Sequence, residues 1–144
     1  MKYIIIAIVV IIAVVGVIGY FVLSDTINTP EMKNETIEGV TVSVPLETNL
    51  TKTAFDTYKD EKVGVQFAVQ NSSAEVVFFG SAMDGRDDMN RITLENISSD
   101  TIAWKSDEGW INILVVNKDG SKGICVGAKD NEELAIKIAN TVKF

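Results

Sequence analysis

The sequence contains no histidine, one cysteine (Cys125) and two prolines. Without histidine, the chain cannot supply a Ser-His-Asp or Cys-His catalytic site, an HExxH zinc site or any histidine-ligated metal. A single cysteine excludes an internal disulfide and a CxxC redox pair, which leaves a buried, inert thiol or an intermolecular disulfide at Cys125. The GxGxxG and GxxxxGK(S/T) patterns of phosphate-cradling loops are also missing.

Positive charge is scarce as well. The chain carries 13 basic and 20 acidic side chains, a formal net charge of −7. A negative field disfavours nucleic acid and anionic lipid headgroups as partners. We therefore expect no nucleic-acid partner. Together with the excluded chemistries, this predicts a protein that is not an enzyme and has no cofactor and no metal.

Aliphatic residues are abundant at the start of the chain, "MKYIIIAIVVIIAVVGVIGYFVLSD", and positions 3–23 carry no charge. At about 1.5 Å per residue this run reaches roughly 30 Å, the thickness of a hydrocarbon core. The run predicts a transmembrane anchor at 1–23, in which residues 3–23 contact the membrane. Lys2 before the run favours a cytoplasmic N-terminus and a single-pass cell-membrane protein with an extracytoplasmic C-terminal domain. The alternative is a signal cleaved after Ser24.

Four Asn-X-Ser/Thr patterns support an extracytoplasmic location independently of the apolar run. They read "NET", "NLT", "NSS" and "NIS". Each is an acceptor pattern for N-glycosylation, which requires an exposed position in a loop or at a strand end. The candidate glycosylation sites are Asn34, Asn49, Asn71 and Asn96.

Beyond the apolar run, composition separates a polar stalk at 24–38 from one folded domain at 39–144. The second part is long enough for a single hydrophobic core. Apolar residues alternate with polar ones in most of it, which predicts strands. The Asp119-Gly120 pair predicts a hairpin turn. Strands are expected at 40–44, 53–58, 63–69, 75–80, 101–104, 110–116 and 123–127, while 87–97 fits either a short helix or a strand.

The last segment, "DNEELAIKIANTVKF", changes period. Asp130 is a candidate N-cap, with Glu133 three residues later. Leu134, Ile138 and Val142 then form one apolar stripe. The predicted fold class is α+β: an N-terminal transmembrane helix, then a small antiparallel β-sheet domain of six or seven strands in a meander, with one C-terminal helix packed on it.

Two features are candidates for binding. The segment 84–95 has the length of a calcium loop, but Arg86 and Met89 occupy positions where an EF-hand needs a ligand and a glycine, which favours a solvated acidic turn. Trp104 and Trp110 bracket "KSDEG" and form a candidate interaction platform for a sugar or a protein side chain. The alternative is that they pack in the core.

The segments "NLTKTAFDTYKDEKVGVQFAVQNSS", "NKDGSKGI" and "DNEELAIKIANTVKF" carry a resemblance to a group of known proteins. In these segments and in its general plan, the chain resembles the uncharacterised small single-span surface proteins of methanogenic archaea. The resemblance implies an archaeal cell-surface location. It transfers no catalytic or binding residue to this chain.

The predicted function is a membrane-anchored extracytoplasmic binding or interaction module with a protein or carbohydrate partner at the cell surface. One alternative is a pilin-like structural subunit, which filaments in expressing cells would favour. The other is a surface enzyme that uses carboxylate or lysine chemistry. A deep pocket with a desolvated carboxylate or lysine would favour that alternative.

Overall fold

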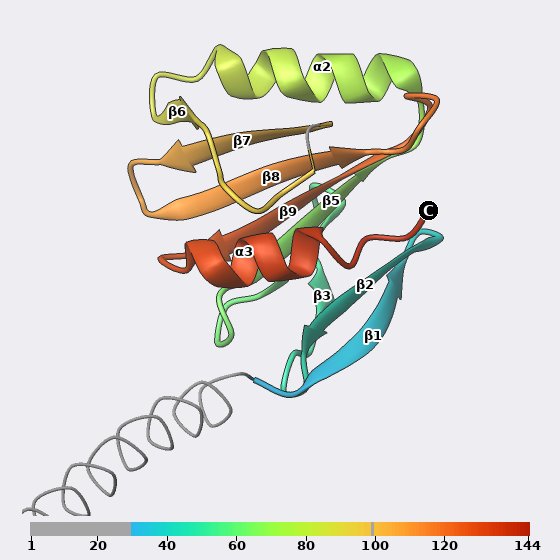
Figure 1. The fold of residues 1–144 in the computed structure, drawn as a ribbon, viewed down its shortest axis with the longest axis vertical. Helices are drawn as coiled ribbons and strands as arrows, with labels where there is room; N and C mark the ends of the chain where they lie inside the picture. The colour runs from blue at the N-terminus through green and yellow to red at the C-terminus, as the bar shows by residue number, and fades with distance from the viewer. Residues whose placement is uncertain (1–29, 99) are drawn as a thin grey trace, which may run out of the picture. The chain divides into compact units, whose positions relative to one another are not determined.

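The computed structural model describes residues 30–98 and 100–144, and in this part the chain forms nine strands and two helices. Most of the strands are antiparallel neighbours joined by tight turns (Figure 1). In chain order the elements are β1 Met32–Ile37, β2 Val40–Pro45, β3 Thr51–Lys52, β4 Thr57–Asp60, β5 Val65–Gln70, α2 Ser73–Asp84, β6 Met89–Ile92, β7 Thr101–Ser106, β8 Trp110–Val116, β9 Gly123–Lys129 and α3 Glu132–Ala139.

The main sheet has seven strands in the order β3-β4-β5-β9-β8-β7-β6. The chain builds β3, β4 and β5 outward, crosses through α2 to the far edge, and returns through β6, β7 and β8. Strand β9 then closes the sheet against β5, with Phe67 opposite Val126. Every neighbouring pair is antiparallel. The sheet is therefore not the simple meander that the sequence predicts, because β5 and β9 pair although residues 71–122 separate them in the chain.

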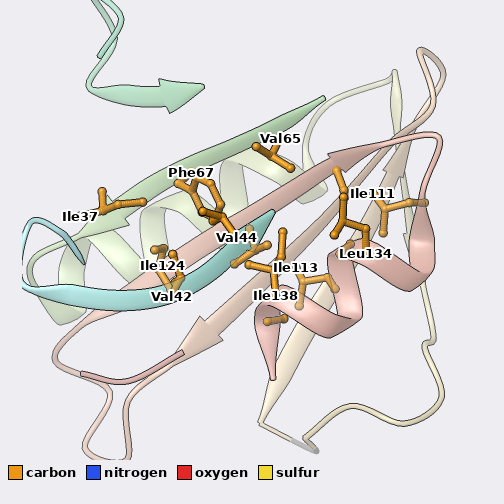
Figure 2. Close-up of a cluster of buried hydrophobic side chains, with 14 of the residues drawn as sticks. Ile37, Val42, Val44, Val65, Phe67, Ile111, Ile113, Ile124, Leu134 and Ile138 are labelled. Atoms are coloured by element: carbon orange, nitrogen blue, oxygen red, sulfur yellow. The ribbon is translucent and has the colours of Figure 1, made fainter. Parts of the chain in front are cut away.

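Alternate residues of the strands point to opposite sides of the sheet, as the two-residue period of a strand requires. One side carries a large apolar cluster, which α3 and the β1–β2 hairpin cover. Figure 2 shows this cluster, in which side chains of the sheet, the helix and the hairpin converge. Its members include Val42, Val44, Val65, Phe67, Ile111, Ile113, Ile124, Leu134 and Ile138.

The opposite side of the sheet is covered by α2, over a smaller area. Met83, Trp104 and Leu114 form the buried cluster there. The Phe79 ring meets the Trp104 ring edge to face, with 6.5 Å between centroids. The Trp104 indole Nε1–H donates to Asp84 Oδ1 at 2.8 Å, which satisfies a polar group that burial would otherwise leave unpaired. The domain thus has three layers, with α2 on one side and α3 and the hairpin on the other (Figure 1).

Strand β9 also carries the single cysteine. Cys125 is buried, and burial raises the pKa of its thiol to about 12. The thiolate is the reactive form, so this side chain is inert while the domain stays folded. The sequence-based prediction of a buried thiol is confirmed.

Helix α2 is a correction to the predicted secondary structure. The sequence predicts a strand at 75–80 after an "NSS" hairpin, whereas these residues are helical and the structure has two helices in its described part. Ser72 is the N-cap, and its Oγ accepts from Glu75 N at 3.2 Å. The Glu75 carboxylate in turn accepts from Asn71 N at 2.7 Å. These two contacts start a helix in a β-prone run of valines and phenylalanines.

The fold class with a transmembrane helix and the single-pass membrane location are contradicted by the structure. In residues 30–98 and 100–144, neither helix has the length and apolarity needed to cross a membrane. The predicted anchor at 1–23 itself lies outside the described residues. The structure therefore does not support the anchored architecture or the single-pass location.

Several local predictions are confirmed, with shifted bounds. Strand β8 matches 110–116, β7 and β9 extend 101–104 and 123–127, and residues 87–97 contain strand β6. The strand expected at 53–58 is wrong for its first four residues, since 53–56 form the turn between β3 and β4 and only 57–58 belong to a strand, β4. Strand β1 occupies 32–37, which the sequence predicts as stalk. The N-cap of α3 is Asn131, whose Oδ1 accepts from Leu134 N at 2.9 Å, rather than Asp130.

Candidate functional site

The four candidate glycosylation sites are all exposed. Asn34 lies in β1, where its Oδ1 accepts from Ser43 Oγ at 2.8 Å. Asn71 precedes α2, and its Nδ2 donates to Glu38 Oε2 at 3.0 Å. Asn49 and Asn96 lie in loops, the latter with a φ of 59°. Their use as glycan acceptors stays a prediction, because exposure is required for modification but does not establish it.

The two tryptophans of the candidate platform are separated by the structure. Trp104 is fully buried under α2, opposite Asn112 in the sheet, so it belongs to the core and presents no face to a ligand. Trp110 is half-buried and lies opposite Lys129 on the other neighbouring strand. Only Trp110 of the pair therefore remains available for contact with a partner.

Trp110 borders a polar depression on the α2 side of the sheet. The cavity measures about 200 Å³. It lies beyond the end of α2, so that strand and turn side chains rather than those of the helix form its walls. The lining residues are Gln66, Arg86, Asp88, Met89, Ser106, Glu108 and Trp110. Four strands and two turns supply these residues, and we call the site the polar depression.

A pair of carboxamides lies next to this cavity. Gln66 Nε2 donates to Asn112 Oδ1 at 3.1 Å across the intervening strand β9. Gly127 of β9 makes this contact possible, because a Cβ there would lie 2.5 Å from Gln66 Cγ and 3.0 Å from Asn112 Oδ1. Asn112 is only 2% exposed, and within the described residues its Nδ2 has no hydrogen-bond partner. A buried donor of this kind is costly to leave unpaired.

Three charged side chains, Arg86, Asp88 and Glu108, are among those that line the polar depression. Arg86 Nε donates to Asp88 Oδ1 at 2.8 Å and Arg86 Nη2 to Asp88 Oδ2 at 2.6 Å. This bidentate pair lowers the pKa of the Asp88 carboxyl and raises the pKa of Arg86. Both side chains are about half exposed, so the pair orients the rim and contributes little to stability.

The residues of the candidate calcium loop at 84–95 have unrelated structural roles. Asp84 accepts from the Trp104 indole, while Asp88 pairs with Arg86. Strand β6 occupies residues 89–92 of the segment. In the described part of the chain, no three acidic or cysteine side chains gather in an arrangement that could hold a metal ion.

Sequence reasoning misses the carboxamide pair and Ser106. Gln66 alternates with apolar neighbours and so looks like an ordinary solvent-facing strand residue. Asn112 offered the better signal, since it interrupts the apolar run of β8 between Ile111 and Ile113. Their meeting depends on β5 and β8 both flanking β9, a pairing that the local sequence does not specify.

These features define a three-layered α+β domain whose sheet is covered on one side by a helix and a hairpin and only partly covered on the other by α2. Comparison with known proteins adds no closer assignment: no protein-family model and no curated protein matches the chain.

Proposed function

We propose that this chain is a binding module, that the polar depression is its ligand site, and that the ligand is a neutral saccharide. The observation that carries the proposal is the combination of a half-buried indole, Trp110, with the amide of Gln66 and the hydroxyl of Ser106, which line the same cavity. An aromatic face stacks on the C–H face of a sugar ring. Amide and hydroxyl groups supply the donors and acceptors that orient sugar hydroxyls.

The hydrogen-bonding groups and charges of the polar depression fit the same ligand class. Gln66 and Ser106 can both donate and accept, as a hydroxyl-rich ligand requires. Arg86 is already neutralised by Asp88, and Glu108 adds a further negative charge at the rim. An anionic ligand would meet this carboxylate and the net charge of −7. A cavity of about 200 Å³ accommodates a single ring rather than an extended chain.

The pKa shifts among the described carboxylates give no support for a reaction. Glu38, Asp60, Glu61, Asp88 and Asp119 all have lowered pKa values because hydrogen bonds stabilise their charged forms. A general acid at neutral pH needs the opposite shift. Binding is therefore the function that the geometry supports best.

The test is saturation-transfer NMR of the full chain against a panel of neutral hexoses and N-acetylhexosamines. We expect transfer to at least one sugar with a Kd of roughly millimolar, the range of a small, shallow site. Trp110→Ala should abolish the transfer because it removes the stacking face.

Phe55→Ala is the matched control, since Phe55 is an aromatic that is 91% exposed and does not line the polar depression. This variant should bind as the natural chain does. Absence of transfer from every sugar, or equal loss in both variants, would contradict the proposed function.

A further inference from the structure

Asn112 is a polar residue in an apolar part of the sheet. It lies in β8 between Ile111 and Ile113 and is 2% exposed. Among the described residues, its side chain makes a single hydrogen bond, the one that its Oδ1 accepts from Gln66 Nε2 at 3.1 Å. Its own Nδ2 finds no acceptor there. One accepted hydrogen bond gains less than an unpaired buried donor costs, so stability does not explain an amide at this position.

Gln66 has one end of its carboxamide held and the other end free. The side chain lines the polar depression. Its Nε2 is bonded to Asn112, whereas its Oε1 accepts no hydrogen bond within the described part of the chain and is not one of the buried unpaired atoms. The oxygen is therefore accessible at the wall of the cavity, as an acceptor that lacks a protein donor.

The two carboxamides differ in how freely they can turn. Asn112 is enclosed in the sheet, with Trp104 opposite it on β7 and Gly127 opposite it on β9. Gln66 lies beyond Gly127 on β5 and is half-buried. A glutamine side chain on its own can rotate and present either its oxygen or its two N–H donors. The enclosed Asn112 Oδ1 removes this freedom, because only the nitrogen of Gln66 can donate to it.

From this geometry we infer that Asn112 is a positioning residue of the polar depression. It holds Gln66 with Oε1 toward the ligand, so that the site selects a sugar hydroxyl that donates at this point. The inference rests on the proposed function and specifies how the same site discriminates between ligands. A fluorine in place of that hydroxyl cannot donate, and the site then sets an acceptor against an acceptor. A site built to pair with a hydroxyl rejects an analogue in this way.

The test uses deoxyfluoro sugars. The methyl glycosides of glucose, galactose, mannose and N-acetylglucosamine, and their deoxyfluoro analogues, are titrated into the full chain and followed by NMR. At one ring position fluorine should weaken binding to the natural chain roughly three- to tenfold, the contribution of one hydrogen bond. Asn112→Leu keeps the branching of the side chain but removes the amide. Gln66 is then free to turn, and the same fluorine should weaken binding less than about twofold.

Gln70→Met is the matched control for Gln66→Met. Both glutamines lie in β5, and Gln70 Nε2 also donates one hydrogen bond, to Ala68 O at 3.1 Å, but Gln70 does not line the polar depression. Gln66→Met should remove the discrimination between hydroxyl and fluorine, whereas Gln70→Met should keep it. Asn112→Leu should leave the midpoint of thermal unfolding unchanged or raise it, because it removes the unpaired donor.

A measurement without ligand separates this inference from the proposed function. The chain contains two glutamines and therefore two pairs of glutamine side-chain amide signals, which Gln66→Met assigns. The Gln66 amide protons should exchange with water more slowly than those of free glutamine, because one of them is bonded to Asn112. Asn112→Leu should remove this protection and leave the Gln70 signals as they are.

Two results would overturn the inference. One is a Gln66 amide that exchanges in the natural chain as fast as free glutamine does. The other is a folded Asn112→Leu variant that rejects the fluorinated sugar as strongly as the natural chain does. If the Gln66 amide is protected but none of the glycosides binds, it is the proposed function that fails, and the selectivity that rests on it fails with it.

Discussion

Asp60, at the end of β4, connects three stretches of backbone. It is 9% exposed, and its two carboxylate oxygens accept from Asn49 N at 2.7 Å, Lys62 N at 2.9 Å and Val63 N at 3.1 Å. The same residue thus closes the turn into β5 and fixes the segment before β3. These hydrogen bonds favour the ionised form and lower the pKa of the carboxyl.

Asp60→Ala should lower the free energy of unfolding at pH 7 by about 2 kcal/mol, because it leaves backbone donors unpaired in a partly buried site. The folded-state pKa lies below the ordinary value of 3.8. The stabilisation is therefore fully present above about pH 3.8 and is lost as the pH falls through the folded-state pKa. Urea unfolding at several pH values should show the two chains converging in acid.

Glu61→Ala is the control for Asp60, since Glu61 is an exposed carboxylate one residue further on that pairs with Lys59 at the surface. Its removal should change the stability little at any pH. An equal loss in both variants would show that net charge, and not the hydrogen bonds of Asp60, determines the effect.

At the scale of the element, α2 depends on its cap. Its valines and phenylalanines favour a strand in isolation, and its outward face gains nothing from burial in a single domain. Ser72→Ala should therefore lower the free energy of unfolding by about 1 kcal/mol, because it removes the Oγ that accepts from the Glu75 N–H. Thermal unfolding followed by circular dichroism measures the loss.

Ser73→Ala is the matched control for the cap. Ser73 is the first helical residue, is exposed, and makes no side-chain hydrogen bond in the described structure. It should leave the stability nearly unchanged. If both substitutions lower the free energy of unfolding equally, the Ser72 cap does not stabilise the start of α2.

The elements also show how far the sequence predicts the fold. Strand β8 is predictable because its short, nearly continuous apolar run is typical of a strand buried on both faces, and helix α3 is predictable because its apolar period matches the face it buries. The prediction is wrong for helix α2, because "EVVFFG" lacks a polar stripe and favours a strand by composition. The pattern Ser72-Ser73-Ala74-Glu75 is nevertheless a capping box, and it was the available signal for a helix.

The candidate site is less predictable than the elements. Trp110 can be identified from the sequence as a candidate for binding. The burial of Trp104 cannot be predicted in the same way, because it depends on α2 lying over β7. The contact between Gln66 and Asn112 depends on long-range strand order in the same way. Sequence patterns specify which face a residue takes more readily than which residue it meets there.

The packing of strands around the carboxamide pair yields a further prediction. Gly127→Ala should lower the free energy of unfolding by roughly 1–3 kcal/mol, because its Cβ would overlap Gln66. Gln66→Ala in the same chain should recover most of this loss, which a double-mutant cycle measures as coupling.

Gly80→Ala is the control for steric crowding. A Cβ there meets no atom within 4 Å, and Gly80 lies inside α2. This variant should be as stable as the natural chain or more stable, by up to about 1 kcal/mol. If Gln66→Ala does not restore the stability that Gly127→Ala loses, the carboxamide pair is not the reason that position 127 requires a glycine.

At the scale of the whole molecule, Glu38 joins the hairpin layer to the sheet. Its carboxylate accepts from Tyr58 Oη at 3.1 Å, Asn71 Nδ2 at 3.0 Å and Lys52 Nζ at 3.4 Å. Lys122 Nζ donates to its backbone carbonyl at 2.7 Å. With the hairpin and α3 closing one side of the sheet, it is the α2 side that carries the polar depression.

The most direct test of this account is a ¹H–¹⁵N spectrum of the full chain, titrated with the sugar that gives saturation transfer. The chain has two tryptophans and therefore two indole N–H signals, which Trp110→Phe assigns. We predict that the Trp110 signal shifts with sugar concentration while the Trp104 signal, bonded to Asp84 beneath α2, stays in place. An unmoved Trp110 signal at saturating sugar would contradict binding at the polar depression.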